Sequence, residues 1–385
     1  MADGVLLERE TQLVPSDDGA CIFNNDIILE ILSWVPGKSL LRCRRVCKSW
    51  CTLISDPNFV RKQCSQAVRH STNLRLLMFT NRWHFLIKSI DYESLLSFLT
   101  KNKHENISRV VVPRCRRHKL PLTQPDNRNV WIMGSSNGLV CLFLNGHYTL
   151  LWNPCTGNSK KIPKPSPEAF LPAFYGFGYD SATDDYKVIC NCLSADRTNE
   201  VFVFTLKTGS WRIVEGIDHI GSDRGLLLNG ALHWLNIKRR ADGSIDPKST
   251  TITSFDLAKE KFQELVSLPN VLGDIFLGED LGVYKSSHLL CSFDNFRFGN
   301  TEIWVMMEYG VEQSWTKLIV LKDQDLSHPV YVSEDDKVFI GLRQGDLKLY
   351  DLKENRYRSI LKPKKQLRLA FALYVETLVS PATGK

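Results

Sequence analysis

The segment that decides the fold reads Val201-Phe-Val-Phe204, Lys207-Thr-Gly209, Trp211-Arg-Ile213. It contains a run of β-branched and aromatic residues, a turn, and a second run with aromatic and basic residues, as in a β-hairpin. The same pattern recurs along most of the chain at intervals of about 50 residues. The recurring turn positions are Gly157, Gly209, Glu260, Gly310 and Glu354.

At least one more short strand precedes each of these hairpins, so each unit contains roughly four strands. Units of about 50 residues with four strands are typical of kelch-like propeller blades, whereas a twisted β-sandwich with similar hairpins is the alternative. The segments Arg75–Phe79 and Phe85–Ser89 fit a further, irregular unit, and Ala370–Leu378 fits a strand that closes the ring. We therefore expect residues 75–380 to form an all-β, propeller-like domain of about six irregular blades.

The region from residue 23 to residue 64 has a helical period instead. Ile28, Ile31, Leu32 and Val35 recur on one helix face, and Pro36-Gly37 ends that helix. Ser39 is a candidate cap for a second helix. A third helix is indicated by the apolar positions Cys47, Trp50, Leu53 and Ile54. Pro57 is well placed to begin a fourth helix before Phe59.

A helical unit of about 40 residues rarely buries enough apolar surface to be stable alone. Its apolar face therefore either docks on a partner or packs against the larger domain, and the periodicity leaves both possibilities open. The predicted organisation is α+β and multidomain. Its parts are a disordered tail over 1–20, a helical domain over 21–64, a connector over 65–74, and the β domain over 75–380.

Composition limits the possible functions. The net charge is +7, and the longest apolar run, Leu369 to Val375, is far shorter than the about 20 residues of a membrane span. The 11 cysteines show no spacing typical of a zinc site, which favours thiols in the cytoplasm or nucleus. We expect no metal, no cofactor and no membrane partner. The basic knot at 114–119 and the basic tract at 353–368 are interpreted as solvated surface.

The helical residues resemble an F-box. The resemblance rests on Asp26–Ser33, Val35-Pro36, Lys38–Leu41, Val46–Trp50 and Leu53–Pro57, in order and at the expected spacing. Family members usually begin with Leu-Pro, whereas Phe23-Asn24 stands here, which places the affinity for the adaptor in doubt. The β region is similar to the plant F-box-associated domain. The segments that carry this similarity are Leu151–Pro154, Tyr175–Asp180, Thr183–Val188, Leu228–Leu235, Ser254–Leu257, Glu302–Val305 and Ser314–Lys317.

The resemblance implies a non-catalytic substrate receptor of a Skp–cullin–F-box ubiquitin ligase. The F-box would bind a Skp-family adaptor, and through it a cullin, while the β domain would select a protein for ubiquitination and degradation. Carried over by position, the adaptor-binding residues are Ile28, Ile31, Leu32, Val35, Pro36, Leu40, Leu41, Val46, Cys47 and Trp50. The substrate-binding loops would include 194–199, 238–249 and 293–299.

Three other functions are alternatives for this sequence. A scaffold that sequesters a partner without degrading it would have the same architecture. Nucleic-acid binding would depend on the two basic segments, but the aromatic residues recur at strand positions typical of core packing. An enzyme is disfavoured because no His or Asp arrangement activates a cysteine. The Gly134-Ser-Ser-Asn-Gly138 match to a hydrolase elbow precedes a strand, not a helix, and therefore indicates a turn.

Overall fold

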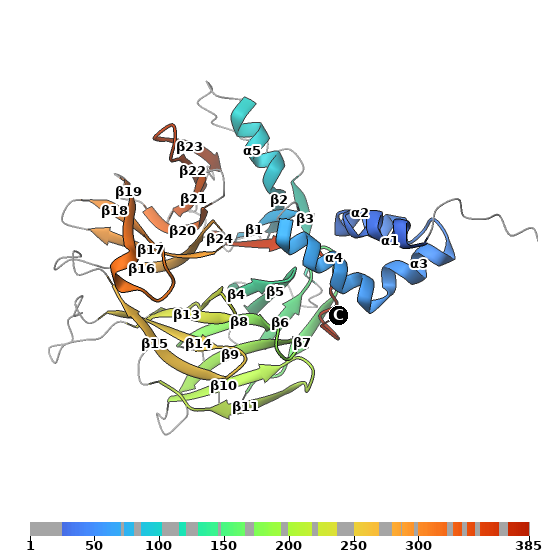
Figure 1. The fold of residues 1–385 in the computed structure, drawn as a ribbon, viewed down its shortest axis with the longest axis horizontal. Helices are drawn as coiled ribbons and strands as arrows, with labels where there is room; N and C mark the ends of the chain where they lie inside the picture. Colours follow the sequence, from blue (N-terminus) through green and yellow to red (C-terminus); the bar gives the residue numbers. More distant parts are fainter. Residues whose placement is uncertain are drawn as a thin grey trace, which may run out of the picture.

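The computed structural model describes helices at the beginning of the chain and strands after them (Figure 1). The described residues are 25–70, 73–80, 86–101, 115–120, 130–144, 148–165, 173–193, 199–217, 222–236, 250–268, 279–285, 287–295, 299–321, 326–332, 337–342, 347–361 and 369–384. The predicted tail over 1–20, like Phe23-Asn24, lies outside them. None of the helices that the structure describes is long and apolar enough to cross a membrane.

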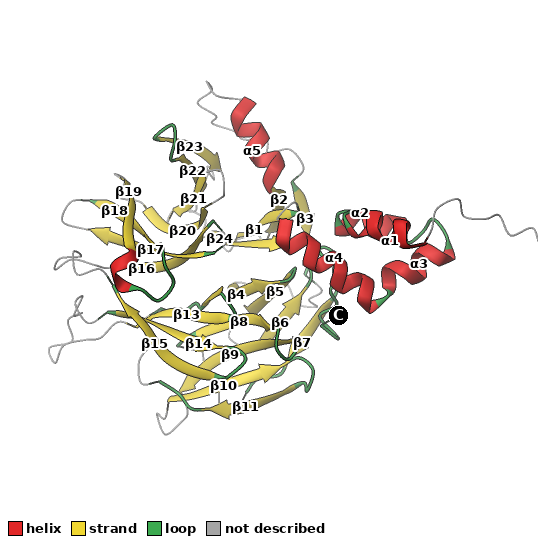
Figure 2. Cartoon of the chain, in the orientation of Figure 1, coloured by secondary structure: helices red, strands yellow, loops and turns green. Residues whose placement is uncertain are grey.

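The first four helices are gathered at one side of the molecule, apart from α5 (Tyr92–Lys101) (Figure 2). Their bounds are α1 Asn25–Ser33, α2 Gly37–Cys43, α3 Lys48–Ser55 and α4 Pro57–His70. Helix α4 runs without a break past the expected domain boundary at residue 64. The four helices therefore match the predicted number, and the last one extends through most of the predicted connector.

Local chemistry explains where these helices begin. The Asp56 carboxylate accepts the backbone N–H groups of Asn58 (2.7 Å) and Phe59 (3.3 Å), which caps α4. The Sγ atom of Cys47 accepts the N–H of Trp50 at the start of α3. The expected cap at Ser39 was wrong, because α2 already begins at Gly37 and has no side-chain cap. Gly37 is buried where a Cβ atom would overlap Cys155 of the β domain, so packing fixes this start.

The strands form four-stranded units in chain order. The first three units have the following strands: β24 (Leu369–Val375) with β1 (Leu74–Thr80), β2 (Leu86–Asp91) and β3 (Arg116–His118); β4 (Val130–Ser136), β5 (Leu139–Leu144), β6 (Tyr148–Trp152) and β7 (Ser159–Ile162); β8 (Tyr175–Asp180), β9 (Asp185–Leu193), β10 (Asn199–Thr205) and β11 (Ser210–Val214).

The other three units continue the same order. Their strands are β12 (Leu226–Leu228), β13 (Ala231–Asn236), β14 (Thr251–Asp256) and β15 (Lys261–Ser267); β16 (Glu279–Tyr284), β17 (His288–Asn295), β18 (Asn300–Met306) and β19 (Trp315–Leu321), with the short 3-10 helix Glu312–Ser314 before β19; β20 (Leu326–Val332), β21 (Lys337–Leu342), β22 (Leu347–Asp351) and β23 (Arg356–Leu361).

These units are the blades of a propeller. Hydrogen bonding among the described residues gives five sheets, because the parallel pair Tyr284 and Val332 joins the last two units into one eight-stranded sheet. The inner strands contact one another in a closed cycle, from β24 to β4, β8, β12, β16, β20 and back to β24. The predicted all-β propeller is therefore confirmed, with about six four-stranded units in five hydrogen-bonded sheets, and the β-sandwich alternative is wrong.

The ring closes by pairing the two ends of the β domain. Strand β24 runs antiparallel to β1, in register from Leu74 opposite Val375 to Thr80 opposite Leu369. The predicted closing strand is confirmed. Because β1 gains a partner on the side that would otherwise be a free edge, no long unpaired strand remains at the joint.

Charged residues form ion pairs next to this closing strand. Glu376 follows β24 and is buried, and its carboxylate pairs with the buried Arg75 of β1 (3.4 Å) and with Arg116 of β3. Desolvation, together with these two arginines, lowers the pKa of His118 to about 4. The interpretation of 114–119 as solvated surface was wrong for His118, which is largely desolvated, whereas the Arg116 side chain stays 38% exposed while it pairs with the buried Glu376.

The residues after β24 are held by the turn between β6 and β7. The buried Asn153 amide donates to the carbonyls of Thr377 (3.1 Å) and Val379 (2.7 Å), and its oxygen accepts the N–H groups of Cys155 and Thr156. Nearby, the predicted turn is confirmed at Asn137-Gly138, which joins β4 to β5, whereas Gly134 to Ser136 form the end of β4. Gly138 has a φ of 84°, and a Cβ atom there would overlap Thr377.

We expect Asn153→Ala to destabilise the fold by about 2–4 kcal/mol, because buried carbonyl and N–H groups would lose their partners. The free energy of unfolding, measured in urea, checks this. The exposed neighbour Asn158→Ala is the control and should change stability by less than about 0.5 kcal/mol. Equal losses in the two variants would contradict the role of Asn153.

Candidate functional site

The structure divides the ten predicted adaptor-binding residues into three groups. Leu32 and Leu40 are buried in a core shared with the propeller. The partly buried members that pack on that core are Ile28, Val35, Leu41 and Trp50. The exposed members are Ile31, Pro36, Val46 and Cys47. One part of the set therefore packs in the core shared with the larger domain, and another part is left exposed to solvent.

Helix α1 carries an exposed apolar stripe. Ile27 and Ile31 of α1 and Trp34, in the turn directly after the helix, are exposed by 49%, 59% and 48%, and their spacing continues one helix face. Val46, in the turn between α2 and α3, is 65% exposed. Exposed apolar side chains that gather in this way are typical of a protein-binding surface. We call Ile27, Ile31 and Trp34 the α1 stripe.

Polar contacts to α4 fix one end of the α1 stripe. The Trp34 indole N–H donates to Glu30 (3.1 Å), and its ring packs on His70 with centroids 4.8 Å apart. Glu30 also accepts from Lys62 and Gln66 of α4. The hydrogen bond from Lys62 is the main cause that lowers the pKa of Glu30, so the carboxylate stays charged and holds the indole in place. A side chain fixed before binding loses less entropy on docking.

The opposite face of the helices packs against the propeller. Leu32, Leu40 and Ile54 share one hydrophobic cluster with strands β4–β11 and with Leu378 and Val379. Polar contacts cross the same junction. The Lys38 ammonium donates to the Cys155 carbonyl (3.4 Å), and the buried Gln63 amide of α4 donates to the Glu376 carbonyl (3.3 Å). The helical domain is thus seated on the ring through the C-terminal residues.

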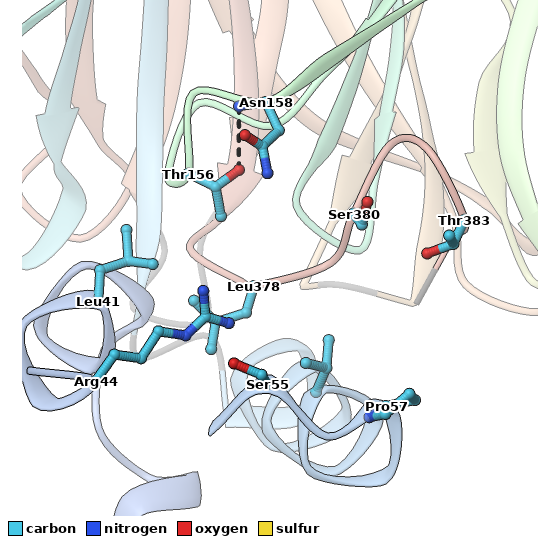
Figure 3. Close-up of a pocket in the computed structure, with 10 residues that line it drawn as sticks. Leu41, Arg44, Ser55, Pro57, Thr156, Asn158, Leu378, Ser380 and Thr383 are labelled. Carbon is cyan, nitrogen blue, oxygen red and sulfur yellow. Dashed lines mark hydrogen bonds between the residues drawn. The ribbon is translucent and has the colours of Figure 1, made fainter. Parts of the chain in front are cut away.

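A cavity of about 390 Å³ lies at this junction (Figure 3). It is enclosed between the helices, through Leu41, Arg44 and Ser55, and the C-terminal segment at Leu378 and Ser380. Figure 3 shows the Arg44 side chain reaching toward Leu378 above Ser55. The cavity therefore has walls from both domains.

The thiols of this region are placed for packing or capping. Burial raises the pKa of Cys64 and Cys155 to about 12, so both stay protonated near neutral pH. Cys47 is exposed and caps α3. Among the described residues, no three His, Cys, Asp or Glu side chains come together as metal ligands.

Sequence reasoning missed Ile27 and Trp34. The spacing that placed Ile28, Leu32 and Val35 on one face also gives Ile27, Ile31 and Trp34 a face of their own, and this second series was the available signal. The predicted substrate loops fall largely outside the described residues, at 194–198, 237–249 and 296–298.

The split of α1 into a buried and an exposed stripe predicts different effects of neighbouring truncations. Leu32→Ala should destabilise the full chain by about 2–5 kcal/mol, because it leaves a cavity in the core. Ile31→Ala should change stability by less than about 0.5 kcal/mol, because the side chain already contacts water. Urea unfolding of both variants checks this, and similar losses would mean that Ile31 also supports the fold.

The comparisons agree with this architecture. Residues 21–62 match the F-box domain, and residues 82–380 match the F-box associated beta propeller domain. F-box protein CPR1 of Arabidopsis thaliana is 29% identical over 374 residues, covering 87% of this chain and 83% of its own length. F-box protein DOR of the same plant is 27% identical, covering 80% of this chain and 83% of its own length.

A putative TolB from Agrobacterium tumefaciens aligns at 11% identity with a TM-score of 0.42, over 79% of this chain and 98% of that one. The chain belongs to the F-box proteins that carry an F-box-associated beta-propeller domain.

Proposed function

We propose that this protein is the substrate-receptor subunit of a Skp–cullin–F-box ubiquitin ligase and performs no bond chemistry itself. The observation that carries the proposal is the division of the F-box helices into two faces. One face is buried against the propeller, and the α1 stripe with Val46 is left open. A Skp-family adaptor would cover the open face and link the chain to a cullin.

The proposed mechanism is proximity. A substrate held by the propeller would have its lysines kept near the conjugating enzyme, which raises their effective concentration. Such a receptor works best if the two domains keep a fixed relation. The shared core, the Gln63–Glu376 hydrogen bond and the unbroken helix α4 supply this rigidity.

The proposal does not depend on the basic segments. Within the first, Arg116 is paired with Glu376; within the second, Arg356 and Arg358 both pair with Glu354. Each of these arginines pairs with an acid of the same chain, although Arg356 and Arg358 share one, and such pairing does not favour binding of a nucleic-acid backbone. We place the site of action in the cytoplasm or nucleus, where thiols such as Cys47 and Cys51 stay reduced.

Adaptor binding is tested by co-purifying the full chain with a Skp-family adaptor. Ile31→Asp and Val46→Asp should each lower adaptor recovery by about tenfold or more, since central interface residues contribute about 2 kcal/mol or more. Ile213→Asp, at a 60% exposed position on β11, is the matched control and should bind normally. Leu32 is a poor test position, because a charge there disrupts the core. Full recovery with both F-box variants would overturn the proposed docking face.

Degradation is tested separately from binding. Partners of the propeller are captured while the proteasome is inhibited, and their half-lives are then followed with the chain overexpressed. The intact chain should shorten the half-life of a true substrate, and Ile31→Asp should not, because it keeps the propeller and loses the adaptor. A captured partner whose half-life is unchanged or lengthened by the intact chain would indicate sequestration and contradict the receptor function.

A further inference from the structure

A groove runs between β15 and the turn that joins β18 to β19. Its volume is about 510 Å³, and it is lined by residues 264–267 on one side and 310–313 on the other. Because β15 and β19 are the outermost strands of their units, the groove lies at the rim of the propeller. Figure 2 draws the short 3-10 helix Glu312–Ser314 of this turn in red, beside β15 and on the opposite side of the ring from α1–α4. The groove is therefore separate from the α1 stripe.

The turn beside the groove exposes two large apolar side chains. Met307 is 51% exposed, and Tyr309, which directly precedes the groove-lining Gly310, is 39% exposed. Leu265, on the opposite side, is partly buried. A Cβ atom at Gly310 would lie 3.6 Å from the Leu265 side chain, so the turn stands directly across from β15. Exposed apolar side chains next to a groove offer a contact for an apolar group of a partner.

Tyr309 is held in position by a histidine of the neighbouring blade. His233 of β13 is buried, and its Nδ1 lies 3.2 Å from the Leu226 carbonyl. Because a carbonyl oxygen only accepts, Nδ1 carries the proton, and Nε2 accepts from the Tyr309 hydroxyl (2.6 Å). Burial lowers the pKa of His233 to about 4, so the imidazole is neutral at neutral pH. The exposed ring is thus fixed before a partner binds, which reduces the entropy lost on docking.

Further hydrogen bonds hold the two sides of the groove together. Ser314 Oγ accepts the N–H of Glu308 (3.0 Å) and so fixes the turn. The Trp315 indole, at the end of the turn, donates to the Ser267 carbonyl of β15 (3.2 Å). The groove therefore exists before any partner arrives, and binding does not have to build it.

The groove is acidic, although the chain as a whole has a net charge of +7. Among the described residues that line it, Glu264 and Glu312 are glutamates and none is basic. Glu308 is exposed in the same turn. No ion pair joins Glu308 or Glu312 to a cation in the described part of the chain. The groove therefore suits a cationic partner, and its carboxylates repel the phosphates of a nucleic acid.

Strand β15 favours an extended partner. It pairs with β14 on one side, and no other strand follows it in its sheet within the described ranges. The edge of a sheet can take an added strand from another protein, and the side chains of that strand then alternate between its two faces. A segment with alternating basic and apolar side chains would present both kinds of group to this groove.

We propose that the groove binds an extended, basic segment of a partner protein, with apolar side chains of the segment against Met307 and Tyr309 and its cations beside the three glutamates. This surface goes beyond the proposed receptor function. It does not include the α1 stripe, so it can be tested independently of adaptor binding.

The test is fluorescence anisotropy of a labelled heptapeptide of alternating lysine and leucine, titrated with the full chain in about 0.15 M salt. We expect a Kd of about 0.1 mM or tighter. Two control peptides, one with glutamate in place of lysine and one with glycine in place of leucine, should each bind at least about tenfold more weakly, because each lacks one of the two kinds of contact. No binding of the lysine–leucine peptide, or equal binding of either control peptide, would overturn the proposal.

Variants locate the binding on the chain. Glu308→Lys combined with Glu312→Lys should weaken the peptide affinity by about tenfold or more, because like charges then face each other. Met307→Ser should weaken it by about threefold or more, because an apolar contact is lost. Glu215→Lys and Ile213→Ser, at exposed positions on and after β11, are the matched controls and should bind the peptide normally.

The groove variants should still recover the adaptor as the unmodified chain does, which shows that they are folded and separates this site from the receptor function. Unchanged peptide affinity in both groove variants would overturn the site, whatever happens to adaptor binding.

Discussion

The pairing of β24 with β1 is the contact on which the rest of the molecule depends. It joins the end of the β domain to its beginning, and it also fixes where residues 376–384 must go. Those residues are held by the Asn153 amide and form the surface on which the F-box helices sit. The pairing of β24 with β1 therefore closes the ring and also positions the residues on which the F-box helices pack. Ion pairs of the buried Glu376 carboxylate with Arg75 and Arg116 also stabilise this joint.

The F-box helices show how a small domain can be stable and still keep an open face. Leu32 and Leu40 are buried in a cluster that the helices share with the propeller, so the α1 stripe is not needed for the core. Burying a leucine contributes about 1.5–3 kcal/mol, which a bundle of this size cannot easily supply from within. Because the ring completes the inner face, the outer face can remain apolar and available to a partner. Glu30 then keeps Trp34 in position on that face.

Local patterns predicted most of the architecture. The hairpin turns near Gly157 and Gly209, the closing strand and the start of α4 at Pro57 all follow from short-range chemistry, which a sequence displays directly. The division of the predicted site could not be predicted in this way. Ile31 and Leu32 are adjacent in sequence and equally apolar, and only the tertiary packing of Leu32 in the cluster shared by the helices and the propeller decides which one is covered. The wrong cap at Ser39 has the same origin, because the packing of Gly37 against the ring sets the start of α2.

The placement of Leu378 and Val379 beneath the helices has a consequence for biosynthesis. The helices leave the ribosome first, but two of the apolar side chains in the cluster that they share with the ring, Leu378 and Val379, are translated last. Domains usually fold as they emerge, whereas the inner face of this one is completed only when almost the whole chain has been made. During translation its inner face is exposed and open to chaperones. The surface on which the F-box helices pack is thus complete only when the ring is closed.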